Sequence, residues 1–282
     1  MSLPTDLPEQ VSRALREDIG SGDVTARLID STATGTARVL CREAAIICGT
    51  AWFDETFRQL EPRVQVRWQV QEGAAVAPGT ELCELQGPMR ALLTGERTAL
   101  NFLQLLSATA TVTAEYVRIL AGSSCRVLDT RKTIPGLRSA QKYAVRCGGG
   151  QNHRLGLHDM VLIKENHIAA AGSIAAAVRA ARELAPGLPL EVETENLAEF
   201  AAALTASDDV IMLDDYALED MRTAVAMNRT SARPAKIEVS GGVSIERLPG
   251  IAATGVDYIS IGGLTKHVRA VDLSMRLDAA NR

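Results

Sequence analysis

Charged side chains and glycine turns fall at the ends of short apolar runs in the second half of the chain. The set consists of Asp129-Thr-Arg-Lys, Lys164, Glu193, Asp214, Ser240-Gly-Gly and Gly262-Gly. When such runs are parallel β-strands of an α/β barrel, the groups at their carboxyl ends meet at one mouth. The sequence therefore predicts a site that combines cations, carboxylates and glycine turns.

The basic residues of this set belong to a dense segment. Residues 126–167 hold eight Lys or Arg against three Asp or Glu, a balance of +5, while the whole chain carries −4. A concentrated positive field in an acidic protein favours an anionic ligand and argues against nonspecific nucleic-acid binding, although a solvated basic face stays open. Guanidinium forks suit carboxylates and phosphates, and His153 is either a ligand contact or a structural histidine. The basic candidates are Arg131, Lys132, Arg138, His153, Arg154 and Lys164.

The carboxylates and the glycine turns indicate the other half of the chemistry. Glu193 and Asp214 can bind Mg²⁺, accept hydrogen bonds from sugar hydroxyls or stabilise a developing cation. A structural salt bridge is equally open, and Asp215 is an alternative acid. The two Gly-Gly pairs are either plain turns or, together, a phosphate cradle in which backbone N–H groups approach the oxygens.

Six apolar runs are predicted to be the strands that position these groups. Helical segments separate most of them, and repeated β-then-α units imply parallel strands with right-handed crossovers. The runs are apolar throughout, as expected when both faces of a sheet are covered. An incomplete α/β barrel is predicted, with an open doubly wound sheet as the alternative. The strands are expected at 126–129, 159–163, 189–193, 209–213, 236–240 and 257–261, and the helices at 173–184, 196–205, 217–228 and 244–253.

The first part of the chain predicts a separate α+β domain with a small antiparallel sheet. A helix is expected over 8–17, an alternating strand over 64–70 and a short strand over 81–85. A long helix, apolar on several sides and so buried, is expected over 94–120. The domains are predicted as 1–110 and 111–268.

The composition is close to that of an ordinary soluble globular protein. With 282 residues, 46% apolar and 23% charged, the chain has no apolar stretch long enough for a membrane span and no basic-then-apolar secretory leader. The five cysteines are odd in number, widely spaced and without a C-x-x-C pair, which indicates neither a disulfide framework nor a zinc knuckle. A cytoplasmic protein is expected.

The residues alone thus predict an enzyme for a phosphorylated sugar and an anionic second substrate, with Mg²⁺ as candidate cofactor. Two other classes remain open at this point. One is a barrel aldolase or isomerase that forms a Schiff base at Lys164, and the other is a non-catalytic anion-binding protein.

Several long motifs resemble one family. They are Thr94-Gly-Glu-Arg-Thr-Ala-Leu-Asn, Asp129-Thr-Arg-Lys-Thr-Ile-Pro-Gly-Leu-Arg, Gly148-Gly-Gly-Gln-Asn-His-Arg and Leu157-His-Asp-Met-Val-Leu-Ile-Lys-Glu-Asn-His. With Glu191-Val-Glu-Thr, Met212-Leu-Asp, Glu238-Val-Ser-Gly-Gly and Ser260-Ile-Gly-Gly, the sequence closely resembles the quinolinate phosphoribosyltransferases of de novo NAD biosynthesis.

The resemblance implies the fold and the reaction. It implies an α+β sandwich domain joined to an incomplete, TIM-like α/β barrel, with a C-terminal helix at 269–282 returning to the first domain. It implies a homodimer or higher homo-oligomer that converts quinolinate and phosphoribosyl pyrophosphate into nicotinate mononucleotide, pyrophosphate and CO₂ with Mg²⁺. A related phosphoribosyltransferase that acts on another acid is the runner-up.

The resemblance also implies roles for the matching residues. Arg131, His153, Arg154 and Lys164 correspond to the quinolinate carboxylate site, and Arg97 to a contribution from the partner chain. Thr130 is expected among the substrate contacts, and Lys132, Glu193 and Asp214 on the phosphoribosyl and metal side as the catalytic group. Lys266 is left out of the site. The expected phosphate cradle consists of Ser240, Gly241, Gly242, Ile261, Gly262 and Gly263.

Overall fold

The computed structural model describes residues 2–206 and 209–278, and the chain divides into two compact units. The first unit comprises Met1–Ala114, Thr133–Gly149 and Gly263–Arg282, and the second comprises Glu115–Lys132 and Gly150–Gly262. The segment 133–149, placed with the barrel from the sequence, is therefore part of the first unit. The predicted domain boundaries themselves stay a prediction.

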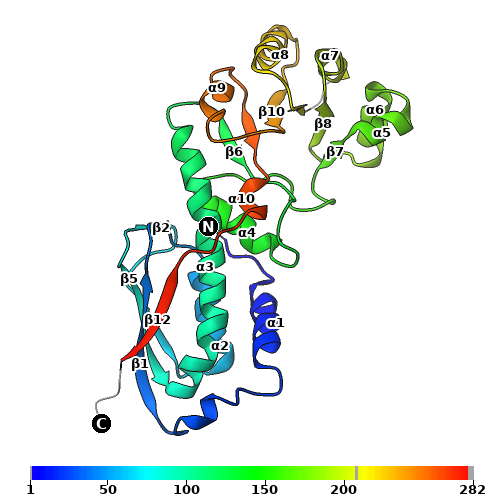
Figure 1. Cartoon of the computed structure of the whole chain (residues 1–282). Helices are drawn as coiled ribbons and strands as arrows, with labels where there is room; N and C mark the ends of the chain where they lie inside the picture. The colour runs from blue at the N-terminus through cyan, green and yellow to red at the C-terminus, as the bar shows by residue number, and fades with distance from the viewer. Residues whose placement is uncertain (1, 207–208, 279–282) are drawn as a thin grey trace. The chain divides into compact units, whose positions relative to one another are not determined.

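The first unit is built on a four-stranded antiparallel sheet. Its strands are β1 (Thr34–Cys41), β3 (Gln65–Trp68), β5 (Glu81–Pro88) and β12 (Leu273–Asp278), in the order β12-β1-β5-β3. Helices α2 (Thr50–Leu60) and α3 (Met89–Ile119) pack beside this sheet (Figure 1). Apolar side chains of these helices and of one face of the sheet pack together in a shared core, so this face of the sheet is buried. The core includes Val39, Phe53, Phe57, Leu82, Leu85, Leu100 and Leu103.

Shorter elements complete the first unit. They are α1 (Leu7–Ile19), the 3-10 turn η1 (Ala26–Leu28), the bridge pair β2 (Ala45–Ile46) and β4 (Ala75–Val76), α4 (Arg138–Cys147) and α10 (Gly263–Lys266). Helix α4 lies between the first two barrel strands, where the sequence predicted no helix. Its buried face, around Tyr143 and Ala144, packs with the apolar side of α1 at Val11.

The expected C-terminal helix is wrong for the residues described. Leu273–Asp278 form β12, which runs antiparallel to β1 with Leu273 opposite Cys41 and Asp278 opposite Thr36. The alternation of Leu273, Met275 and Leu277 with polar residues has the period of a strand, so one side faces the core. Residues 279–282 of the predicted helix lie outside the described residues. The chain does return to the first unit, as a sheet strand.

The second unit is one parallel sheet with the strand order β6-β11-β10-β9-β8-β7. Consecutive strands from β7 to β11 are neighbours, and β6, the first along the chain, pairs with β11, the last. This circular order is that of a barrel, and the sheet of described residues is interrupted between β6 and β7. The predicted incomplete α/β barrel with an N-terminal α+β domain is confirmed. The strands are β6 (Arg126–Leu128), β7 (Val161–Ile163), β8 (Leu190–Thr194), β9 (Val210–Asp214), β10 (Lys236–Ser240) and β11 (Tyr258–Ser260).

The interruption follows from the path of the chain after β6. After β6 the chain continues to α4. Gln151, which follows α4, pairs with β6 in the position where a further strand would lie. Gln151 donates to Val127 O at 2.9 Å and accepts from Asp129 N at 3.1 Å. The helices that follow the other strands are α5 (Glu165–Ala171), α6 (Ile174–Leu184), α7 (Leu197–Ala206), α8 (Leu218–Thr230) and α9 (Leu248–Ala252).

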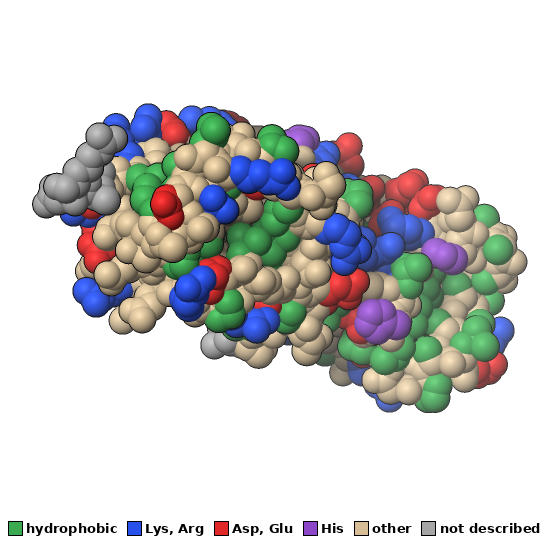
Figure 2. Space-filling model, turned by 90° about the horizontal axis from the view of Figure 1, so that it is seen from below, with side chains coloured by type: hydrophobic (Ala, Val, Ile, Leu, Met, Phe, Trp, Pro, Cys, Tyr) green, Lys and Arg blue, Asp and Glu red, His purple; other side chains and the backbone are tan. Residues whose placement is uncertain are grey.

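One face of the molecule is mixed in charge. On the face in Figure 2, Lys and Arg side chains are interspersed with Asp and Glu and with scattered apolar side chains. Within residues 2–206 and 209–278, no helix is both long enough and apolar enough to cross a bilayer.

Candidate active site

A cavity of about 320 Å³ opens in the second unit where the parallel strands end. Every residue that lines it belongs to this unit, so the arrangement is fixed by the barrel alone. The lining residues are Thr130, Arg131, Lys132, His153, Arg154, Leu162, Lys164, Glu193, Met212, Glu238, Ser240 and Ser260. The sequence predicted eight of these, which are the polar groups at the strand ends and the cations of the loop that contains His153.

The basic side of the cavity carries guanidinium groups close to one another. Burial, followed by the charge of Arg131, lowers the pKa of Arg154. Two cations held together in this way are stabilised when an anion lies between them. Lys132 is positioned by the loop after β6, where its backbone N–H donates to Thr130 Oγ1 at 3.1 Å. This side of the cavity suits a ligand with more than one negative charge.

His153 is fixed by contacts at its backbone and both ring nitrogens. Its backbone N–H donates to the buried Asp129 at 2.9 Å, and its Nδ1 accepts from the Arg154 backbone N–H at 2.8 Å. Because Nδ1 is an acceptor, the proton of the neutral ring lies on Nε2, which is 2.8 Å from Glu191 Oε2. The histidine therefore orients the Arg154 backbone and forms part of the cavity wall.

Two carboxyl groups, Glu191 and Glu238, lie buried behind His153. The second is 3.6 Å from His153 Nε2, and burial raises the pKa of each carboxyl to about 8. Sequence reasoning missed both as parts of the site. The available signal was a glutamate inside an otherwise apolar strand, in Leu-Glu-Val-Glu and in Ile-Glu-Val, where burial of a charge is costly without a partner.

The acidic side of the cavity is formed at the ends of β8 and β9. Glu193 pairs with Lys164 Nζ, which realises the salt-bridge alternative and leaves the carboxylate at the cavity wall. Asp214 ends β9 in register with Ser240 of β10 and is not among the residues that line the cavity. Asp215, the alternative acid, has a positive φ of 55° and donates its backbone N–H to Ser240 O at 2.9 Å. Its backbone is thus part of the turn beside the cavity.

The glycine turn after β10 is required by geometry. Gly241 has φ +81°, and a Cβ there would lie 2.8 Å from Asp215 N and 3.1 Å from Asp214 Oδ1. Only glycine avoids both the left-handed strain and this backbone clash. At the other predicted turn, Gly262 lies against the Lys132 side chain, with 2.8 Å between its virtual Cβ and Lys132 Cδ. Both glycine turns therefore border the cavity.

The remaining predicted residues lie elsewhere in the chain. Ile261 is buried, with its N–H bonded to Leu128 O at 3.0 Å, and Gly263 begins α10 in the first unit. Arg97 is exposed on α3 of the first unit, where it lines a separate surface cavity with Asp18 and Thr94. Arg138 opens α4 and donates to Thr133 Oγ1 at 3.1 Å. None of these four lines the barrel cavity.

A barrel mouth with paired guanidiniums, strand-end carboxylates and glycine turns defines a transferase that acts on a sugar phosphate and an anionic acceptor. Family models for the N-terminal and C-terminal domains of quinolinate phosphoribosyl transferase match residues 23–107 and 109–276. The chain belongs to the quinolinate phosphoribosyltransferase family. The predictions of this family and of an enzyme are confirmed.

Individual relatives agree over the whole length. The chain is 42% identical to the probable nicotinate-nucleotide pyrophosphorylase [carboxylating] of Bacillus subtilis, over 94% of this chain and 91% of the relative. It is 42% identical to the corresponding Mycobacterium leprae enzyme, over 95% and 96%. The solved structure of the nicotinate-nucleotide pyrophosphorylase from Francisella tularensis superposes with a TM-score of 0.94 at 45% identity, covering 98% of each chain.

Proposed function

We propose that this enzyme transfers the phosphoribosyl group of phosphoribosyl pyrophosphate to quinolinate, with release of pyrophosphate and CO₂ and formation of nicotinate mononucleotide. The relatives' names, pyrophosphorylase [carboxylating] and phosphoribosyltransferase [decarboxylating], describe one reaction in opposite directions. The observation that carries the proposal is the barrel cavity, which holds cations and carboxylates within one space of about 320 Å³.

Quinolinate binds on the basic side in this proposal. Its two adjacent carboxylates match the neighbouring Arg131 and Arg154 guanidiniums, because such forks bind planar carboxylates through paired hydrogen bonds. His153 fixes the Arg154 backbone, and Lys164 supplies a further positive charge at the cavity wall. Thr130 shapes the loop that presents Lys132 to the phosphoribosyl group.

The chemical step needs no nucleophilic side chain. The pyridine nitrogen of quinolinate attacks the anomeric carbon as the bond to pyrophosphate breaks, and the electron pair leaves with the pyrophosphate. Glu193 and Asp214, at adjacent strand ends, stabilise the cation-like ribose between the two bonds. The carboxylate next to the quaternised nitrogen is then lost as CO₂. The electron pair of the broken C–C bond stays on the ring carbon beside the positive nitrogen, and a proton from solvent then binds that carbon.

The phosphate groups are assigned to the glycine turns. Gly241 and Gly242 follow β10 and Gly262 follows β11, where backbone N–H groups can approach phosphate oxygens closely. Ser240 lines the cavity next to the first turn and adds a hydroxyl donor. In this proposal Ile261 and Gly263 contribute through the backbone that frames the second turn.

The donor chemistry of the acidic side fits Mg²⁺. The ion prefers oxygen ligands and is typically held by one or two carboxylates together with substrate phosphates, and Glu193 and Asp214 offer these carboxylates. When bound, Mg²⁺ neutralises charge on the pyrophosphate. This assignment depends on the same two residues as the stabilisation of the ribose.

We place Arg97 in the active site of a neighbouring subunit within a homodimer or larger homo-oligomer. Its side chain is exposed on the first unit, and Arg97 is not among the residues that line the barrel cavity of its own chain. Mixing Arg97→Ala chains with inactive Lys132→Ala chains should restore part of the activity, because hybrid oligomers contain one intact site. Complete absence of recovery, with subunit exchange verified by mass, would contradict a shared site.

A cytoplasmic location is proposed as well. The five cysteines all lie among the described residues and are thiols, not halves of disulfides, as is usual in a reducing compartment. Thiol counting on protein isolated from its native cell, with rapid alkylation, tests this proposal.

The decisive experiment measures pyrophosphate and CO₂ from quinolinate, phosphoribosyl pyrophosphate and Mg²⁺. Both products should appear in equal amounts, and nicotinate in place of quinolinate should give neither. Pyrophosphate without CO₂ when nicotinate replaces quinolinate would indicate a transferase for another acid, and no product with either acid would indicate an anion-binding protein. Borohydride trapping of a sugar phosphate on Lys164 would instead identify a Schiff-base enzyme.

Matched variants separate the assigned roles. Glu193→Gln and Asp214→Asn should lower kcat with little change in KM, because the charge they stabilise exists only in the transition state. Lys236→Ala, at the exposed start of β10, is the control and should behave as wild type. Wild-type kinetics in both acidic variants would overturn the assignment.

A further inference from the structure

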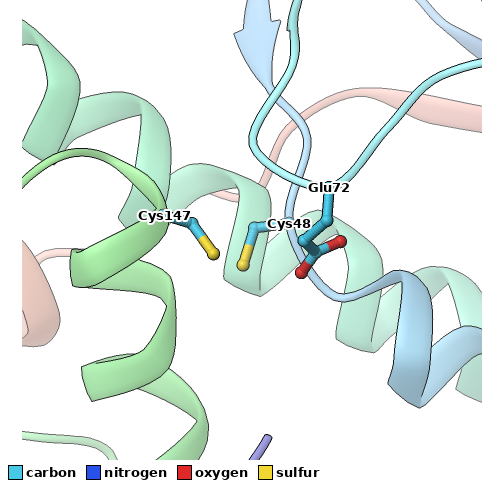
Figure 3. A group of neighbouring side chains, drawn as sticks. All are labelled: Cys48, Glu72 and Cys147. Atoms are coloured by element: carbon cyan, nitrogen blue, oxygen red, sulfur yellow. The ribbon is translucent and has the colours of Figure 1, made fainter. Parts of the chain in front are cut away.

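Two cysteines and a glutamate lie close together in the first unit. None of the three was assigned to the active site above. Cys48 precedes α2, Glu72 lies in the turn between β3 and β4, and Cys147 ends α4. One ligand atom from each lies within 4.8 Å of the others. Figure 3 shows the three side chains converging, with the Cys48 sulfur between the Cys147 sulfur and the Glu72 carboxylate. The residues are so far apart in the sequence that no metal-binding motif could predict the group.

The carboxylate of this group is held in place before any ligand arrives. Glu72 accepts from Gly49 N at 2.8 Å, from Thr50 N at 3.1 Å and from Thr50 Oγ1 at 2.7 Å. These donors include the first backbone N–H groups of α2, so the negative charge lies at a helix N-terminus. The turn is tied to the strand before Cys48, because Gly73 N donates to Ile47 O at 2.7 Å.

Both cysteines are also fixed by their backbone. Cys48 N donates to Ser107 Oγ at 2.9 Å, and the Ser107 hydroxyl donates in turn to Cys48 O at 3.2 Å. Cys147 is followed by Gly148, whose virtual Cβ would lie 2.4 Å from Ala110 O, so α4 ends tightly against α3. The three ligand atoms are thus brought together by the fold and not by flexible side chains alone.

We propose that Cys48, Glu72 and Cys147 form a binding site for a thiophilic divalent cation such as Zn²⁺. Two sulfurs and one carboxylate oxygen make a ligand set that zinc accepts in tetrahedral geometry, with one position left for water. Zinc–sulfur bonds of about 2.3 Å place two sulfur ligands about 3.8 Å apart. Atoms that already lie within 4.8 Å therefore need to approach by no more than about 1 Å.

The negative charge of Glu72 beside the two sulfurs favours a cation at this site. The pKa of Cys147 is lowered, chiefly by its hydrogen bond with Cys48, whereas burial, followed by the hydrogen bond with Cys147 and the charge of Glu72, raises the pKa of Cys48. A bound divalent cation reverses the increase at Cys48, since it stabilises both thiolates and the carboxylate together. Arg146 lies near Cys147 and lowers the pKa of that thiol, which helps to offset the net charge of the loaded site.

Access to the site is compatible with exchange of the ion. Cys48 is fully buried, whereas Glu72 and Cys147 are partly exposed. All three belong to the first unit, whereas the barrel cavity belongs to the second. The bound ion is therefore expected to stabilise the first unit, and its readout is independent of the transferase reaction.

The test titrates the reduced, untagged full chain with Zn²⁺ or Cd²⁺ after removal of metals by a chelator. One equivalent should bind, and Cd²⁺ should give thiolate-to-metal absorption that falls to about half in Cys147→Ser, which leaves one sulfur. Glu72→Gln should weaken binding at least tenfold while leaving two sulfurs per bound ion. Cys125→Ser changes a buried cysteine of the second unit and should bind as wild type.

The results that would overturn the proposal are distinct. The proposal is overturned if the reduced wild-type protein binds no ion. If peroxide then joins Cys48 to Cys147, the two residues are a disulfide pair instead. Binding that stays unchanged in both Cys147→Ser and Glu72→Gln would show that the ion binds elsewhere, and this result also overturns the proposal. Circular dichroism of each variant verifies folding, and the wild-type titration stands without any variant.

Discussion

Replacing Glu238 by glutamine tests the buried carboxyl pair behind His153. Glu238 is about 1% exposed, and burial raises the pKa of its carboxyl to about 8, with a further increase from the charge of Glu191. Glutamine has the same shape as the protonated acid and cannot ionise. The variant therefore removes one titration from the interior of the barrel while keeping its packing.

The sign of the effect follows from the direction of the shift. In the unfolded chain a glutamate releases its proton near about pH 4.3, whereas the folded protein holds it to about pH 8. The stabilising contribution is therefore complete below the unfolded pKa and is lost as the pH rises towards the folded one. One such proton costs about 1.4 kcal/mol of stability per pH unit in this window. Between pH 5.5 and 7.5 the variant should gain on the order of 1–3 kcal/mol relative to wild type, since the two carboxyls titrate as a pair.

The assay is denaturant unfolding followed by circular dichroism at several pH values. Trp52 and Trp68 both lie in the first unit, so tryptophan fluorescence would report that unit and miss the barrel. Glu219→Gln, which removes an exposed carboxylate from α8, is the control and should track wild type at every pH. A constant difference between Glu238→Gln and wild type from pH 5.5 to 7.5 would refute the reasoning.

Three other variants test the cavity and the packing of α4. Gly241→Ala should raise the KM for phosphoribosyl pyrophosphate roughly tenfold at unchanged quinolinate KM, because a left-handed residue with a side chain costs about 1–2 kcal/mol and displaces the turn; steady-state kinetics with an unchanged KM would contradict the cradle. Arg154→Ala should raise the quinolinate KM about 10- to 100-fold, the loss expected for a charged hydrogen bond; a fall in kcat alone would argue against a binding role. Gly148→Ala should destabilise the first unit by about 1–3 kcal/mol, since the added methyl group would clash with Ala110 O. An unchanged melting temperature would contradict this prediction and show that the structure relaxes to accept the methyl group.

Much of the barrel and its site could be predicted from local patterns. Apolar runs that end in polar residues fix both the strands and the direction of their ends, so the sequence predicted all six strands and most cavity-lining cations and acids. Arg154, Lys164 and Glu193 line one cavity because parallel strands carry them to the same edge. The long motifs around these residues were sufficient to indicate the family.

Other features depend on contacts between distant segments, which local patterns indicate weakly or not at all. The segment with α4 was not predicted to be helical, and its helix gains a buried face through α1, α2 and α3. Residues 273–278 form a strand because β1 offers them an edge.

The buried glutamate pair and the group of two cysteines and a glutamate also depend on contacts between distant segments. Glu191 and Glu238 lie on separate strands, and Cys48, Glu72 and Cys147 lie on three separate segments, so their pairing exists only after the chain has folded. The sequence by itself determined which groups stand at the strand ends, because that depends on short-range periodicity. Tertiary structure alone decided which buried groups share an environment, and burial together with proximity sets their charge and their affinity for a proton or a metal ion.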